Sequence, residues 1–213
     1  MARPKTIHDD AILSAAREVF IDAGAQGSTR EIARRLGVSE ATLFKRYPTK
    51  VALFLAAMAP PVPDTARLLA KARAQKDTRK ALHLIGRLTL AYFRTSIPRM
   101  LPLITHPAIG IEELSQRFGE SPASALNDAI SVYLVEQRDQ GAISTAQPRA
   151  AAGLIVAAMH SVVLFELMGL HDGVIPDAAV RAMIDTLWHG IAPKPAPAVR
   201  RQPAAKHMPR PRS

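Results

Sequence analysis

Apolar residues recur at every third or fourth position over most of the 213-residue chain, with polar residues between them. This spacing gathers apolar side chains on one face of an α-helix. No segment alternates apolar and polar residues for long enough to predict a β-strand. The pattern therefore predicts an all-α fold.

Two helices are predicted near the N-terminus, over about residues 8–23 and 29–36. At the start of the second helix, Ser28 and Glu31 have the spacing of a capping box, in which each side chain satisfies an open backbone donor of the other residue. Gly37 is expected to end this helix in the left-handed conformation that glycine adopts readily.

A short cationic helix is predicted within VSEATLFKRYPTK, residues 38–50. Ser39 caps its start and Pro48 ends it by about Tyr47, which leaves room for only two turns. A helix of this length is marginal alone in water, so its neighbours must hold it. Two short helices joined by a glycine-containing turn form a helix-turn-helix. The second helix of such a motif can enter the major groove of DNA with its N-terminal residues against the bases.

The rest of the chain predicts a larger helical body. We expect Pro98 to break one of its helices, because proline removes a hydrogen-bond donor. The segment 98–119, which is punctuated by Pro and Gly, stays unassigned. The predicted body helices span about 49–59, a segment that begins after Asp64, a segment from Asp77 to Ile97, 122–141, 148–170 and 176–189.

Charge is distributed unevenly along the chain. Residues 1–50 hold nine Lys and Arg against six Asp and Glu, residues 51–192 hold thirteen against twelve, and residues 193–213 hold six against none. These three segments are the predicted domains: a helix-turn-helix head, a helical body, and a disordered, basic, Pro-rich tail. Cationic ends favour a polyanionic partner, although the same charges also serve solubility alone. The tail is expected either to add non-specific affinity for DNA or to be an inert end.

Several classes of protein are disfavoured by what the sequence lacks. It has no cysteine, no His-Glu-x-x-His motif and no glycine-rich phosphate loop, so we expect no metal, no cofactor and no catalytic site. The N-terminal MARPKTIHDD contains no apolar signal-peptide core. The apolar run near 150–165 is expected to be too short to span a bilayer, and we interpret it as a buried helix. A cytoplasmic protein without a membrane partner is therefore expected.

An ordered set of residues marks the segment 1–50: Ala15-Ala16, Phe20, Gly24, Ser28-Thr29, Ile32-Ala33, Gly37-Val38-Ser39, Thr42-Leu43-Phe44, Tyr47 and Lys50. In these features and their order, the chain resembles the TetR family of bacterial transcriptional regulators. The resemblance covers about a quarter of the chain, since the body is similar only in being helical and of suitable length. It implies a DNA-binding head and a small-molecule pocket among the body helices.

The predicted DNA contacts come from the two helices of the motif and the start of the next helix. Leu43 and Tyr47 lie four residues apart and can pack inward, while Ala41 and Lys45 are expected nearest to the bases. Glu40 either accepts from a cytosine amino group or only complements its helix dipole. Lys45 either reads a base or only screens phosphate. The full predicted set is Thr29, Glu40, Ala41, Thr42, Phe44, Lys45, Arg46, Tyr47 and Lys50.

Polar and amphipathic residues within apolar helical segments are the candidates for the ligand pocket, although each is also consistent with a satisfied core residue. These candidates are His83, Arg87, Tyr92, His106, Tyr133 and His160. The last two helices carry more apolar surface than one helix pair covers, so we expect them to pair with a second copy. The predicted dimer-interface residues are Leu154, Ala157, Ala158, Ser161, Phe165, Met183 and Leu187.

Together these patterns predict a ligand-responsive DNA-binding regulator. It is expected to be a homodimeric repressor that binds a palindromic double-stranded DNA operator and is released by a small-molecule effector. Its half-sites are expected about one helical turn, roughly 34–36 Å, or a small multiple of that apart. Three alternatives stay open: a DNA-binding regulator without small-molecule control, a small all-α enzyme with a basic tail, and a helical hairpin at 28–50 that packs and binds nothing.

Overall fold

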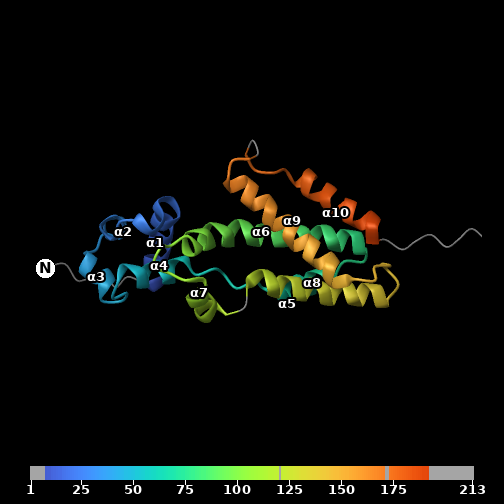
Figure 1. Ribbon diagram of the computed structural model, residues 1–213, viewed down its shortest axis with the longest axis horizontal. Helices are drawn as coiled ribbons and strands as arrows, with labels where there is room; N and C mark the ends of the chain where they lie inside the picture. The colour runs from blue at the N-terminus through green and yellow to red at the C-terminus, as the bar shows by residue number, and fades with distance from the viewer. Residues whose placement is uncertain (1–7, 120, 171–172, 192–213) are drawn as a thin grey trace, which may run out of the picture.

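The structure is a computed structural model that describes residues 8–119, 121–170 and 173–191. Within these residues it contains ten α-helices, one short 3₁₀ helix and no β-strand, which confirms the all-α prediction. The prediction for the tail, residues 193–213, lies outside the described residues. The helices labelled in Figure 1 and the 3₁₀ helix η1 are α1 (Asp9–Ala23), η1 (Gly24–Gln26), α2 (Thr29–Leu36), α3 (Glu40–Phe44), α4 (Lys50–Met58), α5 (Thr65–Arg73), α6 (Thr78–Ile104), α7 (Ile111–Phe118), α8 (Pro122–Asp139), α9 (Pro148–Leu167) and α10 (Asp177–Ile191).

The helices at the N-terminal end begin and end at local capping signals. The side chains of Ser28, Ser39 and Thr49 each accept a hydrogen bond from a backbone N–H three residues further on, at the starts of α2, α3 and α4. Gly37 has a φ of 70°, which closes α2 and turns the chain into α3. The predicted spans of α1, α2 and α4 are confirmed to within one residue.

The regular part of α3 is shorter than predicted, because it stops at Phe44 and not near Tyr47. The N–H groups of Arg46 and Tyr47 both donate to the carbonyl of Leu43, which tightens the chain into a turn. Pro48 follows directly, and a residue before proline is pushed out of the α conformation. The chain therefore leaves the regular helix after Phe44 and continues as a tight turn as far as Tyr47.

Helix α6 runs through two prolines, so the predicted break at Pro98 is wrong. Pro98 and Pro102 both lie inside the helix, which continues to Ile104. The end of α6 packs on the head, where Leu103 is fully buried in a cluster with side chains of α1 and α4. Burying one leucine side chain contributes about 1.5–3 kcal/mol, which offsets part of the cost of the backbone hydrogen bonds that the prolines remove.

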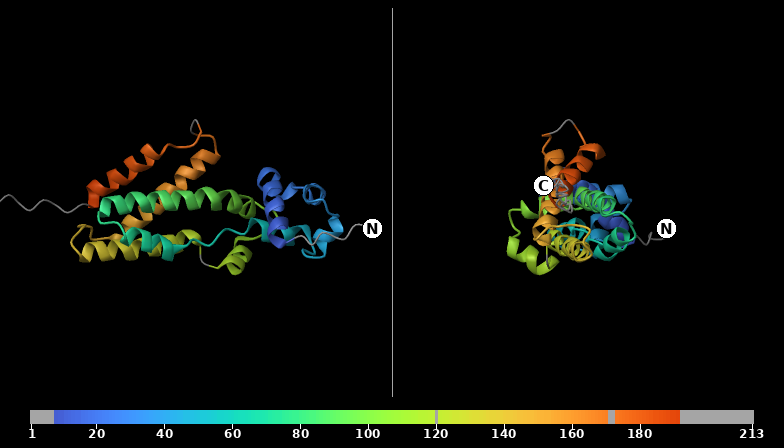
Figure 2. Two further views of the ribbon diagram at one scale, coloured as in Figure 1. Left: turned by 180° about the vertical axis from the view of Figure 1, so that it is seen from behind. Right: turned by 90° about the vertical axis from the view of Figure 1, so that its right-hand side faces the viewer.

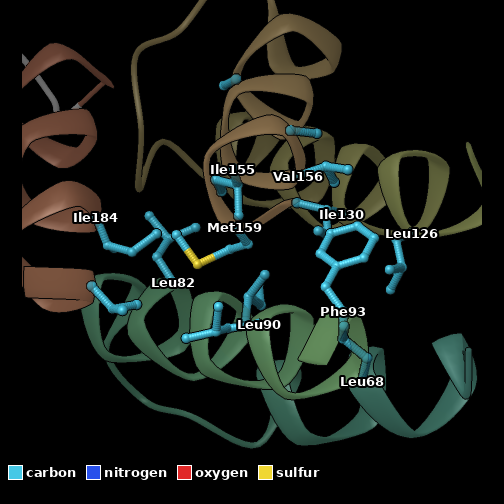
Figure 3. Close-up of a cluster of buried hydrophobic side chains, with 14 of the residues drawn as sticks. Leu68, Leu82, Leu90, Phe93, Leu126, Ile130, Ile155, Val156, Met159 and Ile184 are labelled. Atoms are coloured by element: carbon cyan, nitrogen blue, oxygen red, sulfur yellow. The ribbon is translucent and has the colours of Figure 1, made fainter. Parts of the chain in front are cut away.

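The core of the body lies between α5, α6, α8, α9 and α10. Figure 3 shows side chains from these five helices pointing toward one another, among them Leu68, Phe93 and Met159. Helices α6 and α10 approach closely at Gly86, where an added Cβ atom would lie 3.0 Å from the side chain of Ile184. A side chain at this position would require the Ile184 side chain to shift by a few tenths of an ångström.

The molecule is elongated, with α1–α4 at one end and α8–α10 at the other (Figures 1 and 2). Helix α6 runs from the far end of the body to the head, and α4 and α7 pack beside its last turns. One hydrophobic cluster combines Phe54 of α4, Leu103 of α6 and Leu114 of α7. A shift of α6 would therefore act directly on α4. The predicted domain boundary at residue 50 stays a prediction.

Helix α9 has 20 residues and a mean hydropathy of 1.9 over its most apolar window, so its length and composition would allow it to cross a membrane. This corrects the expectation that the apolar run is too short. Core helices pass the same test, however, and Ala152, Ile155 and Met159 of α9 are buried in the body core against α6 and α8. Packing in the body core accounts for the buried side of α9.

Candidate functional site

Helix α3 lies at the outer end of the head (Figure 1). Leu43 is fully buried and Tyr47 packs against the same cluster, partly buried, so these two side chains hold α3 from beneath. Burial raises the pKa of the Tyr47 phenol. Ala41, Phe44 and Lys45 are exposed. The outward side of α3 therefore presents a small, an aromatic and a cationic side chain to solvent.

Thr29 and Glu40 join the two helices of the motif. Oγ1 of Thr29 donates a hydrogen bond of 2.6 Å to Oε1 of Glu40. The bond holds the Glu40 carboxylate at the start of α3, where the helix dipole favours a negative charge. Thr42 lies in the same first turn, and its hydroxyl is 3.0 Å from Oγ of Ser39. Three hydroxyl groups thus surround the N-terminal turn of α3.

Two of the cations that follow α3, Arg46 and Lys50, have different surroundings. Arg46 forms an ion pair with Asp9, in the first turn of α1. A DNA phosphate would have to compete with this carboxylate for the guanidinium group. Lys50 is the first residue of α4, where the open backbone N–H groups of the helix also favour an anion. Arg46 and Lys50 could both bind DNA phosphate, but Arg46 would first have to leave its ion pair with Asp9.

The capping box predicted at α2 is only half formed. Oγ of Ser28 accepts from the N–H of Glu31 at 3.4 Å, but the Glu31 carboxylate accepts from Arg34 and Arg35 instead, at 2.7 and 2.9 Å. Hydrogen bonds from these two guanidinium groups lower the pKa of Glu31 to about 2. Two positively charged guanidinium groups attract the carboxylate more strongly than one neutral backbone N–H does, so the carboxylate turns away from the backbone donor.

A cavity of about 350 Å³ lies between α6, α8 and α9, and we call it the apolar cavity. It brings together two of the predicted ligand residues, Tyr92 and His160, with Ser96 beside them. The His160 ring packs edge-on against Phe93, with ring centroids 5.2 Å apart. A largely apolar cavity with a few polar groups is the usual form of a small-molecule site. The other lining residues are Ile97, Met100, Leu101, Ile104, Ser121, Pro122, Ala123 and Leu164.

Tyr92 also lines a second cavity, of about 320 Å³, between α5, α6 and α8, which we call the cationic cavity because Arg67 and Lys71 line it. The Tyr92 hydroxyl donates a 2.8 Å hydrogen bond to the carbonyl oxygen of Pro61, in the connection between α4 and α5. Burial raises the pKa of Tyr92, and a hydrogen bond with Ser96 opposes this effect. Tyr92 thus contacts both cavities and the segment that leads to the head.

Two predicted ligand residues on α6 lie outside both cavities. Nε2 of His83 is 2.7 Å from Oδ1 of Asp185 on α10, and Arg79 donates to the same oxygen. Hydrogen bonds from Arg79 and His83 lower the pKa of Asp185 to about 2. Arg87 is exposed. His83 therefore helps to attach α10 to α6, and Arg87 faces solvent. Neither residue lies beside Tyr92 in a cavity.

The last two predicted ligand residues also lie elsewhere. The His106 ring, just after α6, packs against Phe54 of α4, with ring centroids 5.1 Å apart. Tyr133 is buried beside Thr78, and burial raises its pKa to about 12. It lines a separate polar cavity between the end of α5 and α8. His106 is therefore part of the contact between head and body, and Tyr133 belongs to the far end of the body.

The prediction missed one wall of the apolar cavity: Met100, Leu101 and Ile104 follow Ile97, where the predicted helix ends. A signal for these residues was present in the sequence. Their apolar spacing continues that of Ile97 through Pro98 without a break in the helical period. For the question of whether the helix continues past Pro98, the apolar spacing was therefore a better indicator than the proline itself.

The predicted dimer residues lie on α9 and α10. Leu154 is 61% exposed and Met183 is 40% exposed. With Ala158 and Leu187, they line a groove of about 340 Å³ between the two helices. Large apolar side chains exposed together usually mark a surface that another molecule covers. Ala157, Ser161 and Phe165 are also on α9 but do not line this groove.

Comparison with known proteins agrees with the geometry of the head. Residues 12–57 match the family model for bacterial regulatory proteins of the tetR family. No curated protein matches the chain. Among the described residues, no group of three or more His, Asp or Glu side chains is placed to hold a metal ion.

Solved structures share the fold of the whole chain. A protein from Saccharomonospora viridis in complex with choline has 19% identity and a TM-score of 0.69, covering 87% of this chain and 97% of its own. FadR from Bacillus subtilis in complex with stearoyl-CoA has 18% identity and a TM-score of 0.63, covering 84% and 97%. The TetR family regulator PfmR from Thermus thermophilus has 18% identity and a TM-score of 0.60, covering 84% and 97%. At these identities the similarity establishes the fold.

Proposed function

We propose that this chain, a TetR family transcriptional regulator that carries the family's DNA-binding head on a body of the same fold, is a homodimeric repressor released from DNA by a small molecule. The observation that carries the proposal is the placement of α3, held by Leu43 at the outer end of the head with Ala41 and Lys45 exposed. A short helix in this position fits the major groove of DNA. The protein would act in the cytoplasm.

The proposed DNA contacts divide into two groups. Ala41 and Lys45 lie on the exposed side of α3 and would be nearest to base edges, with Phe44 beside them. Thr29, Thr42, Arg46 and Lys50 carry hydroxyl or cationic groups and would bind phosphate. Phosphate contacts fix the position of the head, and base contacts give it sequence preference.

The proposed dimer would form through α9 and α10. The side chains of Leu154 and Met183 flank the groove between these helices and are exposed to water. An exposed apolar surface of this kind is stabilised when another protein surface buries it. A second copy can supply the same surface through a twofold axis. Two heads related by that axis would bind a palindrome whose half-sites lie roughly 34–36 Å apart or a small multiple of that.

Ligand control is proposed from the apolar cavity, which holds Tyr92 and His160 in a mainly apolar wall. Two proteins of this fold bind small molecules: choline in the Saccharomonospora viridis protein and stearoyl-CoA in FadR from Bacillus subtilis. A ligand here would release DNA only if it binds more tightly to a conformation in which the heads are spaced differently. The end of α6 provides a direct route to α4.

The proposal is tested by selecting bound duplexes from a random DNA pool and footprinting the winning site. One protected palindrome is expected, with two half-sites in the predicted spacing. Ala41→Arg should alter or abolish the sequence preference, because a long cation would enter the groove. Enrichment of no site, or an Ala41→Arg variant with unchanged affinity and preference, would contradict the proposed role of α3.

A further inference from the structure

The two cavities that share Tyr92 differ in the chemistry of their walls. The apolar cavity is lined mainly by aliphatic and aromatic side chains, whereas the cationic cavity has Arg67 and Lys71 in its wall. Each cavity alone is at the low end of the range of about 300–1,000 Å³ for ligand sites. The two cavities share Tyr92 in their walls, and together they offer a site of ordinary volume for a ligand.

Arg67 and Lys71 are four residues apart on α5 and therefore lie on the same side of the helix. Neither has an ion-pair partner within the described residues, whereas Arg73 on the same helix binds Glu136. Asp64 also lines this cavity, but its Oδ1 is engaged in capping α5, where it accepts from the N–H of Arg67 at 2.9 Å. The wall thus carries a net positive charge.

We propose that the effector is an amphipathic anion, a single acyl chain that ends in a carboxylate. Its chain lies in the apolar cavity against Phe93, Ile97 and Leu164, and its carboxylate reaches Arg67 and Lys71 beyond Tyr92. A compact ligand would fill only one cavity, and a neutral chain would make no ionic contact with Arg67 and Lys71. The inference rests on the proposed ligand control and names the class of ligand.

The Tyr92 side chain lines both cavities, so an acyl chain that extends from one cavity into the other has to pass it. Its hydroxyl is hydrogen-bonded to the Pro61 carbonyl in the connection between α4 and α5. A chain that occupies both cavities displaces the Tyr92 side chain and breaks this bond. The released connection leads directly into α4, which packs on α1 in the head. This hydrogen bond links ligand binding to head position in addition to the packing of α6 on α4.

The test measures binding of three chain-matched probes to the full-length protein by titration calorimetry, without DNA and below their micelle concentrations. Dodecanoate is expected to bind about five- to tenfold more tightly than dodecanol at low salt, because two exposed cations together contribute on the order of 1 kcal/mol. Dodecyltrimethylammonium is expected to bind more weakly than dodecanol. Equal affinity for dodecanoate and dodecanol, or no binding of dodecanoate, would overturn the proposal.

Two double variants locate the carboxylate. In Arg67→Gln/Lys71→Gln, the affinity for dodecanoate should fall to that for dodecanol, while dodecanol binding stays unchanged. Lys76→Gln/Lys80→Gln removes the same charge from residues that line neither cavity, and it should keep the preference for dodecanoate. A preference that survives in the first variant, or disappears in both, would refute the assigned carboxylate position.

The result is independent of DNA binding, because the probes are titrated in its absence. Failure to find an operator would count against the proposed function and leave the dodecanoate measurement valid. Conversely, binding to a palindrome without a preference for dodecanoate would support the proposed DNA-binding function and refute the proposed class of ligand.

Discussion

The guanidinium group of Arg94 donates two hydrogen bonds to the carboxylate of Glu166, at 3.1 and 2.7 Å. The same carboxylate accepts from the backbone N–H of Ile175 at 2.9 Å. The pair therefore ties α6 to the end of α9 and to the residues that lead into α10. Because Arg94 follows Phe93 of the apolar cavity by one residue, this tie also adjoins the proposed ligand site.

Glu166→Gln should destabilise the body, because the Arg94 side chain is only 33% exposed and would lose its counterion. Breaking a fully buried pair costs 3–5 kcal/mol, and partial exposure reduces the expected loss to about 2 kcal/mol. Urea unfolding measures this loss in the free energy of unfolding. Glu136→Gln, which breaks the more exposed pair with Arg73, should cost less than about 1 kcal/mol. Equal losses in the two variants would show that burial of the Arg94 pair is unimportant.

Asp9→Asn should strengthen DNA binding, because Arg46 would no longer be shared with a carboxylate. An exposed ion pair contributes up to about 1 kcal/mol, so the affinity should rise by up to about fivefold at low salt. The salt dependence should also steepen, by about one unit if Arg46 gains a full phosphate contact. Fluorescence anisotropy over a salt series measures both. Asp10→Asn removes the same charge from the neighbouring residue, and an equal gain there would mean that net charge alone is responsible.

Leu154→Glu and Leu187→Glu should each give monomers or unfolded protein, because a charge within the proposed interface would lack a partner and cost several kcal/mol. Sedimentation velocity measures the mass. Val132→Glu provides a control, since Val132 is 48% exposed on α8, away from the groove between α9 and α10. This variant should keep the wild-type mass. Dimers of normal mass from both leucine variants would be fatal to the proposed interface.

Asp185→Asn should lower the melting temperature at neutral pH, with an effect that fades in acid. Arg79 and His83 hold the pKa of Asp185 at about 2, below its ordinary value of 3.8. A lowered carboxylate pKa contributes stability above the unfolded value and loses it as the pH falls toward the folded value. The difference between variant and wild type should therefore shrink between about pH 4 and pH 2. A difference that stays constant over this range would exclude the linkage.

Tyr92→Phe should reduce the response of DNA binding to ligand, because the hydrogen bond to Pro61 is absent before the ligand arrives. Without ligand, the affinity for DNA should fall toward that of the ligand-bound wild type. One hydrogen bond contributes about 1 kcal/mol, so the change should be about fivefold. Anisotropy titrations of the operator with and without dodecanoate measure it. If dodecanoate weakened DNA binding by this variant as much as by the wild type, the ligand site and the head would be coupled through other contacts.

The sequence by itself determined those elements whose signals lie within one turn of the chain. Ser39, Thr49, Asp64 and Asp77 each accept from a backbone N–H three residues ahead, so the cap and its helix start are adjacent in sequence. The order of α2, Gly37 and α3 also made the helix-turn-helix visible without any distant contact.

Only the tertiary structure decided the features that depend on distant partners. Pro98 stays inside α6, whose end buries Leu103 against the head, and this burial offsets part of the cost of the missing donor. Arg46 meets Asp9 across 37 positions, and Tyr92 meets His160 only through the packing of α6 on α9. Local hydrogen bonds are fixed by residue spacing, whereas these contacts are fixed by which helix faces close upon one another, and that is a property of the assembled core.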